Sequence, residues 1–301
     1  TNEVAFNAAN GSTVWARITN SNGCFRTSRV NLVVSATTVP QTYRYTINDV
    51  CDDYLNATDP NGDGIGYFNL TEIEPALTNQ FPTGQSYTFT YYLNQNDAET
   101  EQNAITDINN FRNTVANNQL IWVRIESNLF ECAGLGPFLE LIVNPLPDTN
   151  LGDDFVICID PVTGIGSQTI NATPITPGNY SYAWTPANPS GNISTYNITT
   201  PGTYEVTVTN LDTSCSFTDS VEATFSSEPA SVTAELLTPA FSTGLATIQA
   251  VAIGGFGVYE YSLNGIDWQP SPVFSNLPNG SYTIYVRDIQ GCGLLLTNTI
   301  Q

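Results

Sequence analysis

Short segments in which apolar and polar residues alternate recur along the chain, and they predict β-strands. In the segment 202–209, Tyr204, Val206 and Val208 fall on one face, because successive side chains of a strand point to opposite sides of the sheet. The apolar spacing of about 3.6 residues that marks an amphipathic helix is rare, and the best helical candidate, 96–109, is short. Glycine, proline, asparagine and serine separate the alternating segments and favour turns. The pattern therefore predicts an all-β protein.

One strand pattern occurs twice and marks the ends of two modules. The segment 13–19 reads TVWARIT and the segment 120–126 reads LIWVRIE; each is followed by a cysteine, a second apolar strand and a proline-bearing linker. Repetition of one supersecondary unit, with short linkers between copies, is typical of tandem modules in an extended array. The predicted divisions are 1–39, the C-terminal part of a module; 40–147, a complete module; 148–228, a third module; and 229–301, a last module.

Four of the six cysteines respect these divisions. Cys51 and Cys132 bracket the complete module, while Cys158 and Cys215 bracket the third, with Trp184 between them. Cysteine, tryptophan and cysteine in this order are typical of an immunoglobulin-like sandwich. The spacing predicts one disulfide within each module and therefore an oxidising, extracytoplasmic compartment.

The other two cysteines lack a partner in their own modules. We expect Cys24 to pair with a residue upstream of the chain, and Cys292 to be free or to pair beyond its end. The alternative to disulfides is a set of buried free thiols.

The chain begins without Met and contains no apolar run of about 18 residues. We therefore interpret it as an internal or processed piece of a larger protein that does not insert into a membrane.

Charge and composition exclude several functional classes. The net charge is −21, from 28 acidic residues against seven arginines, and an acidic surface repels nucleic acid and anionic membranes. The chain has no His and no Lys, so imidazole-dependent nucleophiles, Schiff-base chemistry and the usual zinc sites are absent. Glu99 and Glu101 could suggest a glycosidase pair, but solvated loop charge is the better interpretation. We predict no enzymatic activity and no organic cofactor.

The segment 59–65, DPNGDGI, is the sharpest chemical motif. Asp59, Asn61 and Asp63 offer oxygen ligands at positions 1, 3 and 5 of a calcium loop, with glycine at position 6. Leu70 stands at position 12, where such a loop has Glu, so a structural Ca²⁺ would need further ligands such as Asp52 or Asp53. The competing interpretation is an Asx- and Gly-rich turn between strands.

The repeated strand also pairs an indole with a guanidinium. Trp15 and Arg17, like Trp122 and Arg124, lie two positions apart and so share a face of their strand. A cation–π contact is the structural interpretation, and a platform on which a sugar stacks is the functional one. The duplication favours the structural role.

Two modules resemble known repeats of bacterial surface proteins. The module 40–147 resembles the Ig-like repeats of Bacteroidetes proteins that are exported by the type IX secretion system, and the last module resembles the repeat of the gliding adhesin. The motifs that carry the first resemblance are CDDY at 51–54, GYFNLT at 66–71, IWVRI at 121–125 and LIVNPLP at 141–147. Those that carry the second are YEYSLN at 259–264 and VRDIQGC at 286–292.

The resemblance implies tandem Ig-like β-sandwich modules, with an Ig-like or PKD-like module at 148–228 and a gliding-adhesin-type module at 229–301. It further implies a structural or adhesive stalk of a secreted cell-surface protein, with partners among modules of the same polypeptide, neighbouring copies, or surface glycans and proteins. Exposed edge strands predict pairing with neighbouring copies into a filament. The alternative is a set of carbohydrate-binding modules attached to a secreted enzyme that lies outside the chain.

Overall fold

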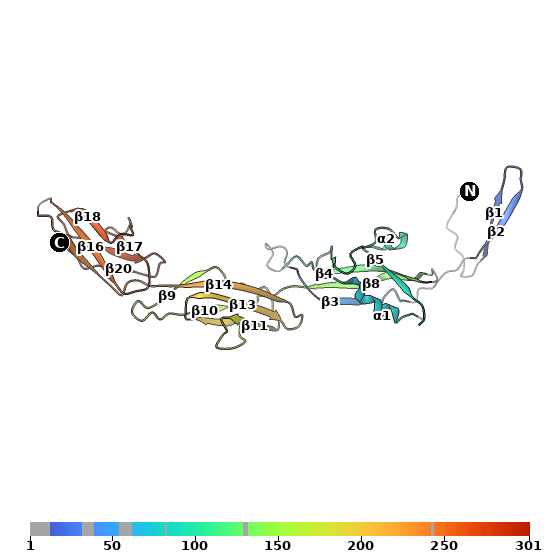
Figure 1. The fold of residues 1–301 in the computed structure, drawn as a ribbon, viewed down its shortest axis with the longest axis horizontal. Coiled ribbons are helices and arrows are strands. Elements are labelled where there is room, and N and C mark those ends of the chain that lie inside the picture. Colours follow the sequence, from blue (N-terminus) through green and yellow to red (C-terminus); the bar gives the residue numbers. More distant parts are fainter. Residues whose placement is uncertain (1–12, 32–38, 54–61, 82, 129–131, 242–243) are drawn as a thin grey trace. The chain divides into compact units, whose positions relative to one another are not determined.

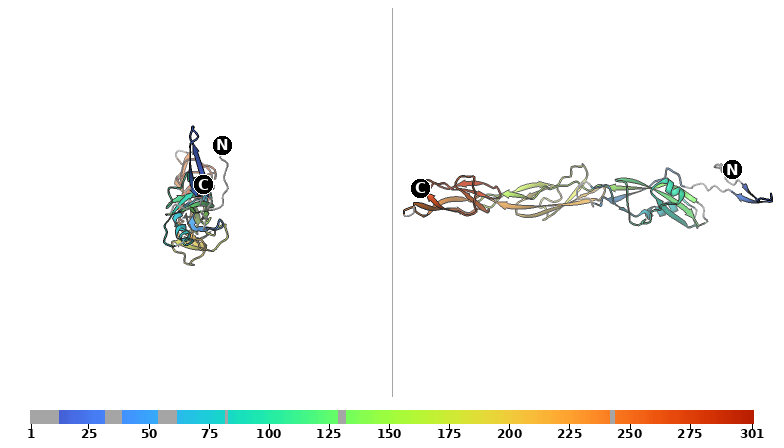
Figure 2. Two further views of the ribbon diagram at one scale, coloured as in Figure 1. Left: turned by 90° about the vertical axis from the view of Figure 1, so that its right-hand side faces the viewer. Right: turned by 90° about the horizontal axis from the view of Figure 1, so that it is seen from above.

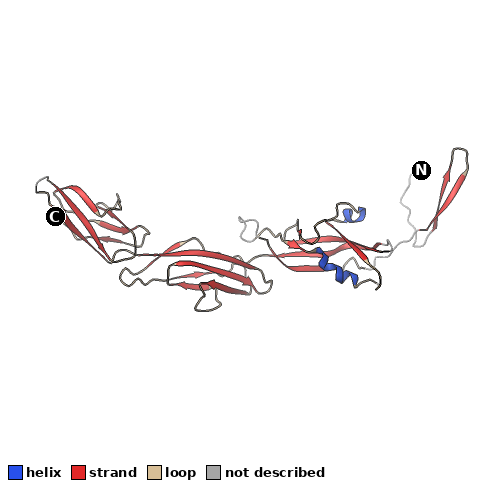
Figure 3. Ribbon diagram, in the orientation of Figure 1, coloured by secondary structure: helices blue, strands red, loops and turns tan. Residues whose placement is uncertain are grey.

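The computed structural model describes residues 13–31, 39–53, 62–81, 83–128, 132–241 and 244–301 of the chain. Strands dominate, and the helices are short and confined to one region (Figure 3). This confirms the prediction of an all-β chain of tandem Ig-like modules. The chain divides into two compact units, Thr1–Leu146 and Pro147–Gln301, which are described separately. None of the described helices is long and apolar enough to cross a membrane.

A two-stranded hairpin contains the first copy of the repeated strand. Strands β1 (Thr13–Thr19) and β2 (Phe25–Asn31) pair antiparallel, with Trp15 opposite Arg29. Nearly every residue of both strands is exposed. The Arg17 guanidinium lies over the ring of Phe25, 3.9 Å from its centroid, so the expected partner Trp15 was wrong.

The first sandwich, β3 to β8, pairs its first and last strands in parallel. Its larger sheet has the order β3-β8-β7-β5, and β4 pairs with β6 in a second sheet (Figure 1). The elements are β3 (Tyr45–Cys51), β4 (Tyr67–Phe68), the 3-10 helix η1 (Leu70–Ile73), α1 (Glu74–Thr78), β5 (Tyr87–Tyr92), α2 (Gln95–Thr100), β6 (Phe111–Arg112), β7 (Asn118–Ser127) and β8 (Cys132–Asn144). The predicted helix at 96–109 is thus shorter, because Glu101 adopts a left-handed conformation that ends α2.

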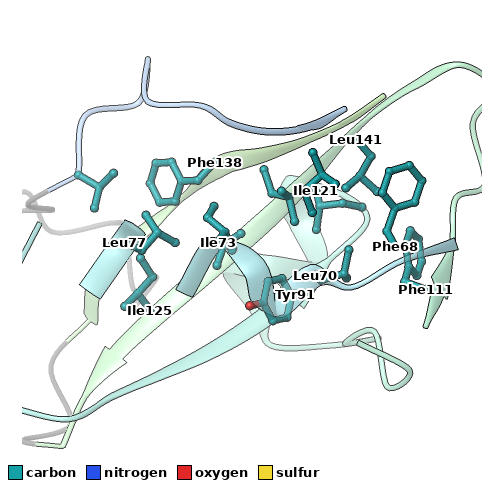
Figure 4. Packing of buried hydrophobic residues seen from close by; sticks show 14 of the residues in the cluster. Phe68, Leu70, Ile73, Leu77, Tyr91, Phe111, Ile121, Ile125, Phe138 and Leu141 are labelled. Carbon is teal, nitrogen blue, oxygen red and sulfur yellow. The ribbon is translucent and has the colours of Figure 1, made fainter. Parts of the chain in front are cut away.

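Alternation along β7 builds the core of this sandwich. Ile121, Val123 and Ile125 are completely buried. They pack in one cluster with residues of η1 and α1 such as Ile73, which close the sandwich from the other side (Figure 4). Burial and the nearby Glu74 carboxylate raise the pKa of Tyr91, so its hydroxyl stays protonated and donates a hydrogen bond to Glu74 Oε1 at 2.9 Å.

The second sandwich comprises β9 to β14. Its four-stranded sheet has the order β11-β13-β14-β9, with β9 parallel to β14, and β10 pairs with β12 (Figure 2 gives two further views). The expected apolar face is present: Tyr204, Val206 and Val208 of β13 are buried. The ring of Tyr196 contacts both Trp184 and Tyr204 in this core. The strands are β9 (Phe155–Cys158), β10 (Gln168–Asn171), β11 (Tyr180–Thr185), β12 (Thr195–Ile198), β13 (Gly202–Asn210) and β14 (Ser216–Ser226).

The third sandwich, β15 to β20, is made of two three-stranded sheets. One has the order β15-β16-β18 and the other the order β17-β19-β20, so the first and last strands lie in different sheets. Ile248, Ile284 and Val286 are at the centre of its core. The strands are β15 (Ser231–Thr238), β16 (Leu245–Ile253), β17 (Tyr259–Ser262), β18 (Val273–Pro278), β19 (Tyr285–Asp288) and β20 (Leu294–Leu296).

The duplicated strand offers a matched pair of substitutions. Ile125 is 0% exposed, whereas Ile18, at the corresponding position of the hairpin, is 77% exposed. We expect Ile125→Ala to lower the free energy of unfolding by about 2–5 kcal/mol, because it leaves a cavity in a packed core. Ile18→Ala should change it by no more than about 0.5 kcal/mol. Urea unfolding of the full chain measures both, and equal effects would contradict this account of the core.

Candidate functional site

A disulfide joins the second sandwich to the third. Cys158 ends β9, Cys292 lies in the turn between β19 and β20, and their Cα atoms are 5.2 Å apart. The expected Cys158–Cys215 pair was therefore wrong, as was the expectation that Cys292 is free or pairs beyond the chain. The reason is strand geometry: Cys158 pairs with Ser226 at the end of β14, whereas Cys215 directly precedes the start of that strand. A strand of this length separates its ends by roughly 30 Å, far beyond the reach of a disulfide.

The remaining cysteines fall into three groups. Cys24 is free and exposed. Cys51 and Cys215 both take part in disulfides. The side chain of Cys132, the predicted partner of Cys51, lies outside the described residues, so that pairing stays a prediction.

Buried hydrogen bonds surround the Cys158–Cys292 bond and define a region that we call the joint, comprising residues 158–164, 226–230, 254–257 and 288–293. Ser226 Oγ donates to Asp288 Oδ1 at 2.8 Å, and both side chains are buried. The backbone N–H of Phe256 donates to Ser227 Oγ at 2.8 Å. The second and third sandwiches are therefore held together by polar contacts as well as by the covalent bond.

The Asp288 carboxylate organises the turn that carries Cys292. Its Oδ2 accepts the backbone N–H groups of Gln290, at 3.2 Å, and Cys292, at 3.1 Å, while Oδ1 accepts the Ser226 hydroxyl. Three donors thus replace water around a carboxylate that is only 2% exposed. This arrangement fixes the position of Cys292 relative to the end of β14.

Close backbone approach explains two glycines of the joint. At Gly257 a Cβ atom would overlap Asp288 Oδ1 and the carbonyl oxygen of Ser227. Gly255 has a φ of +81° and lies against the carbonyl oxygen of Glu228. Sequence reasoning assigned no role to Ser226 or Asp288, and the available signals were the motif VRDIQGC at 286–292, which contains Asp288, and the glycines of 254–257.

A second candidate site lies at the predicted calcium loop. Asp59 and Asn61 lie outside the described residues, but the carboxylates of Asp52, Asp53 and Asp63 lie within 4.8 Å of one another. Asp63 is one of the three predicted ligands, and Asp52 and Asp53 are the additional ligands that the sequence suggested. A cluster of carboxylate oxygens is the donor set that hard divalent cations prefer, so this cluster could hold a metal.

Other groups already satisfy part of this cluster. Arg112 binds Asp53 in a bidentate pair, with Nε–Oδ2 at 2.7 Å, and its NH2 group lies 3.6 Å from Asp63 Oδ2. The hydrogen bond to Asp53 raises the pKa of Arg112. Asp52 is buried and accepts the backbone N–H of Gly64 at 2.6 Å. The positive charge of Arg112 therefore balances the negative charge of one of the three carboxylates. The loop keeps a net negative charge, and glycine builds its turn.

Trp15, Trp122 and Trp268 lie in three different settings. Trp15 is 65% exposed, whereas Trp122 is half-buried in β7. Arg124, expected to lie over Trp122, makes ion pairs with Glu101 at 2.7 Å and Glu126 at 2.9 Å. An arginine–indole contact does occur in the third sandwich, where the Arg287 guanidinium lies 4.0 Å from the ring centroid of Trp268. The Trp-x-Arg spacing of the repeat therefore did not identify the stacked pair.

Comparison with known proteins supports the modular interpretation for one segment. Residues 47–147 match the family described as the Flavobacterium inter-domain disulphide bond domain. The match covers most of the first sandwich and leaves the other two outside it. No curated protein matches the chain.

Similar solved structures are distant. Murine CEACAM1b is 10% identical, with a TM-score of 0.34, over 48% of this chain and 94% of that chain. The N-terminal eight Ig domains of Down Syndrome Cell Adhesion Molecule are 11% identical, with a TM-score of 0.32, over 95% of this chain and 45% of that chain. The human desmocollin-1 ectodomain is 10% identical, with a TM-score of 0.27, over 92% and 61%. Scores this low carry no argument about function.

The polar part of the joint can be tested by one substitution. Asp288→Ala removes both acceptor oxygens, so the backbone N–H groups of Gln290 and Cys292 and the Ser226 hydroxyl lose their acceptor. We expect a loss of about 1–3 kcal/mol in the free energy of unfolding, because these donors are left without a partner. Asp267→Ala, on an exposed turn of the same sandwich, is the matched control. Thermal unfolding at pH 7 measures both, and equal stability of the two variants would contradict the assigned role of Asp288.

Proposed function

We propose that the chain is a non-enzymatic stalk segment of a large secreted bacterial cell-surface protein, with a structural or adhesive role. The observation that carries this proposal is the Cys158–Cys292 bond between two β-sandwiches. Disulfides persist in oxidising compartments outside the cytoplasm, which favours an extracellular location. Bonds between modules limit the motion of one module against the next, a property that a stalk needs and an independent binding module does not.

The secretion route is part of the proposal. The resemblance of the modules to type IX cargo and to the gliding adhesin, together with the Flavobacterium family matched by residues 47–147, supports export by the type IX system and a role in adhesion or gliding. We propose other modules of the same polypeptide as the immediate partners. Neighbouring copies, surface glycans or surface proteins are the further partners, and the net charge of −21 argues against nucleic acid.

Disulfide mapping tests this architecture. After digestion without reductant and with thiols blocked, mass spectrometry should detect a peptide pair joined through Cys158 and Cys292. A Cys24→Ser variant controls for exchange by the exposed free thiol. A Cys158–Cys215 pair would overturn the proposed stalk.

We also propose Ca²⁺ as the ion that the cluster of Asp52, Asp53 and Asp63 would hold, with a purely structural role. Calcium at a hundredfold excess over Kd should then stabilise the first sandwich by about 2.7 kcal/mol. Asp63→Asn should abolish this rise in melting temperature, while Asp153→Asn, on an exposed loop, should preserve it. A melting temperature that does not respond to calcium would show that the loop is an Asx- and Gly-rich turn closed by Arg112.

A further inference from the structure

We propose that the Cys158–Cys292 bond has a mechanical function: it carries tension directly from the second sandwich to the third, past the 133 residues between the two cysteines. This inference rests on the proposed stalk function, because only a chain under tension would use it. The proposal follows from the covalent connectivity and from where the two cysteines are anchored.

Two covalent paths connect Cys158 to Cys292. One runs along the chain over a sequence separation of 134, and the other is a single S–S bond. The Cα atoms are only 5.2 Å apart, whereas the extended chain between them would span about 480 Å. Tension follows the path that becomes taut first, which is the disulfide. The residues between the cysteines therefore form a loop that bears no load while the bond is intact.

The entry side of this path is anchored in a parallel strand pair. Strand β9 runs parallel to β14, with Phe155 beside Ala223 and Cys158 beside Ser226. A pull applied before Phe155 passes along β9 to Cys158 and leaves through the disulfide, while the hydrogen bonds to β14 hold β9 in its register. Cys158 lies at the end of this pair, where β14 gives way to the linker into the third sandwich.

The exit side is anchored by the joint and by the last strand. Asp288 holds the backbone N–H of Cys292, and Glu228 N–H donates to the Cys292 carbonyl oxygen at 3.2 Å. Beyond Cys292, strand β20 pairs with β19, and Ile300 exchanges two backbone hydrogen bonds with Tyr282. Only these last residues carry load on the exit side.

The bypassed residues include the part of the chain least suited to tension. This part is the linker 227–230 and the strand β15, whose sheet is separate from the sheet that contains β20. Without the disulfide, a pull on the two ends of the third sandwich would act between its two sheets, which meet through side chains. With the disulfide, that pull enters at Cys292, next to β20 itself.

Single-molecule force spectroscopy can test this in the full chain. Handles are attached at the exposed Asp153, replaced by an azide-bearing residue, and at Gln301. With the disulfide intact, the fully unfolded chain between the handles should extend by only about 50 Å, and with the bond opened by about 530 Å. Both handles lie a few residues outside the segment that the Cys158–Cys292 bond closes. The shortest covalent path between them therefore runs through this bond, whichever cysteine pairs with Cys51.

Two measurements are needed because the double variant Cys158→Ser/Cys292→Ser could fold poorly. That variant, checked by circular dichroism, should extend by about 530 Å, and a thiol reductant added to the unaltered chain under force should produce a single added step of about 480 Å. Cys24→Ser should behave as the unaltered chain. An extension of about 530 Å without reductant in the unaltered chain would overturn the inference.

The failure of this inference can be distinguished from that of the proposed function. Long extension in the unaltered chain, combined with surface exposure of the protein on intact cells, would remove the mechanical bypass and leave the stalk. Short extension, combined with a location inside the cell, would confirm the bypass as a property of the bond and overturn the stalk.

Discussion

The relation between the second and third sandwiches depends on one covalent bond and on the carboxylate that positions it. The Cys158–Cys292 bond alone would leave its half-exposed turn free to rotate about the S–S link. Asp288 prevents this by accepting the N–H of Cys292 while its other oxygen receives the hydroxyl of Ser226, at the end of β14. Since both side chains are buried, breaking the contact would leave polar groups unpaired, so the joint resists both separation and rotation.

Strand existence was predictable from the sequence because it depends on local alternation. The face formed by Tyr204, Val206 and Val208 is buried as expected, and so is the apolar face of the strand that contains Ile125. Cysteine pairing was not predictable, because it depends on which end of a strand each cysteine occupies. Order along the chain placed Cys158 and Cys215 in one module, but the strand direction places them at opposite ends of it.

The candidate site shows the same division between local and non-local information. The turn around Asp63 could be predicted, since glycine and aspartate set local backbone geometry. The guanidinium that compensates it could not, because Arg112 lies on a different strand and reaches Asp53 only through the pairing of β6 with β4. Likewise, the indole stacked on an arginine is Trp268 and not the repeated Trp122, because Trp268 lies in the segment between β17 and β18 and meets Arg287 of β19 only in the folded sandwich.

The strand order explains why the disulfide is placed where it is. The first and second sandwiches each pair their first strand in parallel with their last, β3 with β8 and β9 with β14, so without a disulfide tension along the chain would act along these ladders of hydrogen bonds, the first of which is irregular between Ile47 and Val50. The third sandwich has β15 and β20 in different sheets, so the same tension would act across side-chain packing instead. A bond that enters this sandwich at Cys292, two residues before β20, removes β15 from the load path. The covalent link therefore takes the load out of the second sandwich at the end of β9 and returns it to the third beside β20, so that neither the β9–β14 ladder nor the packing between the two sheets of the third sandwich has to bear it.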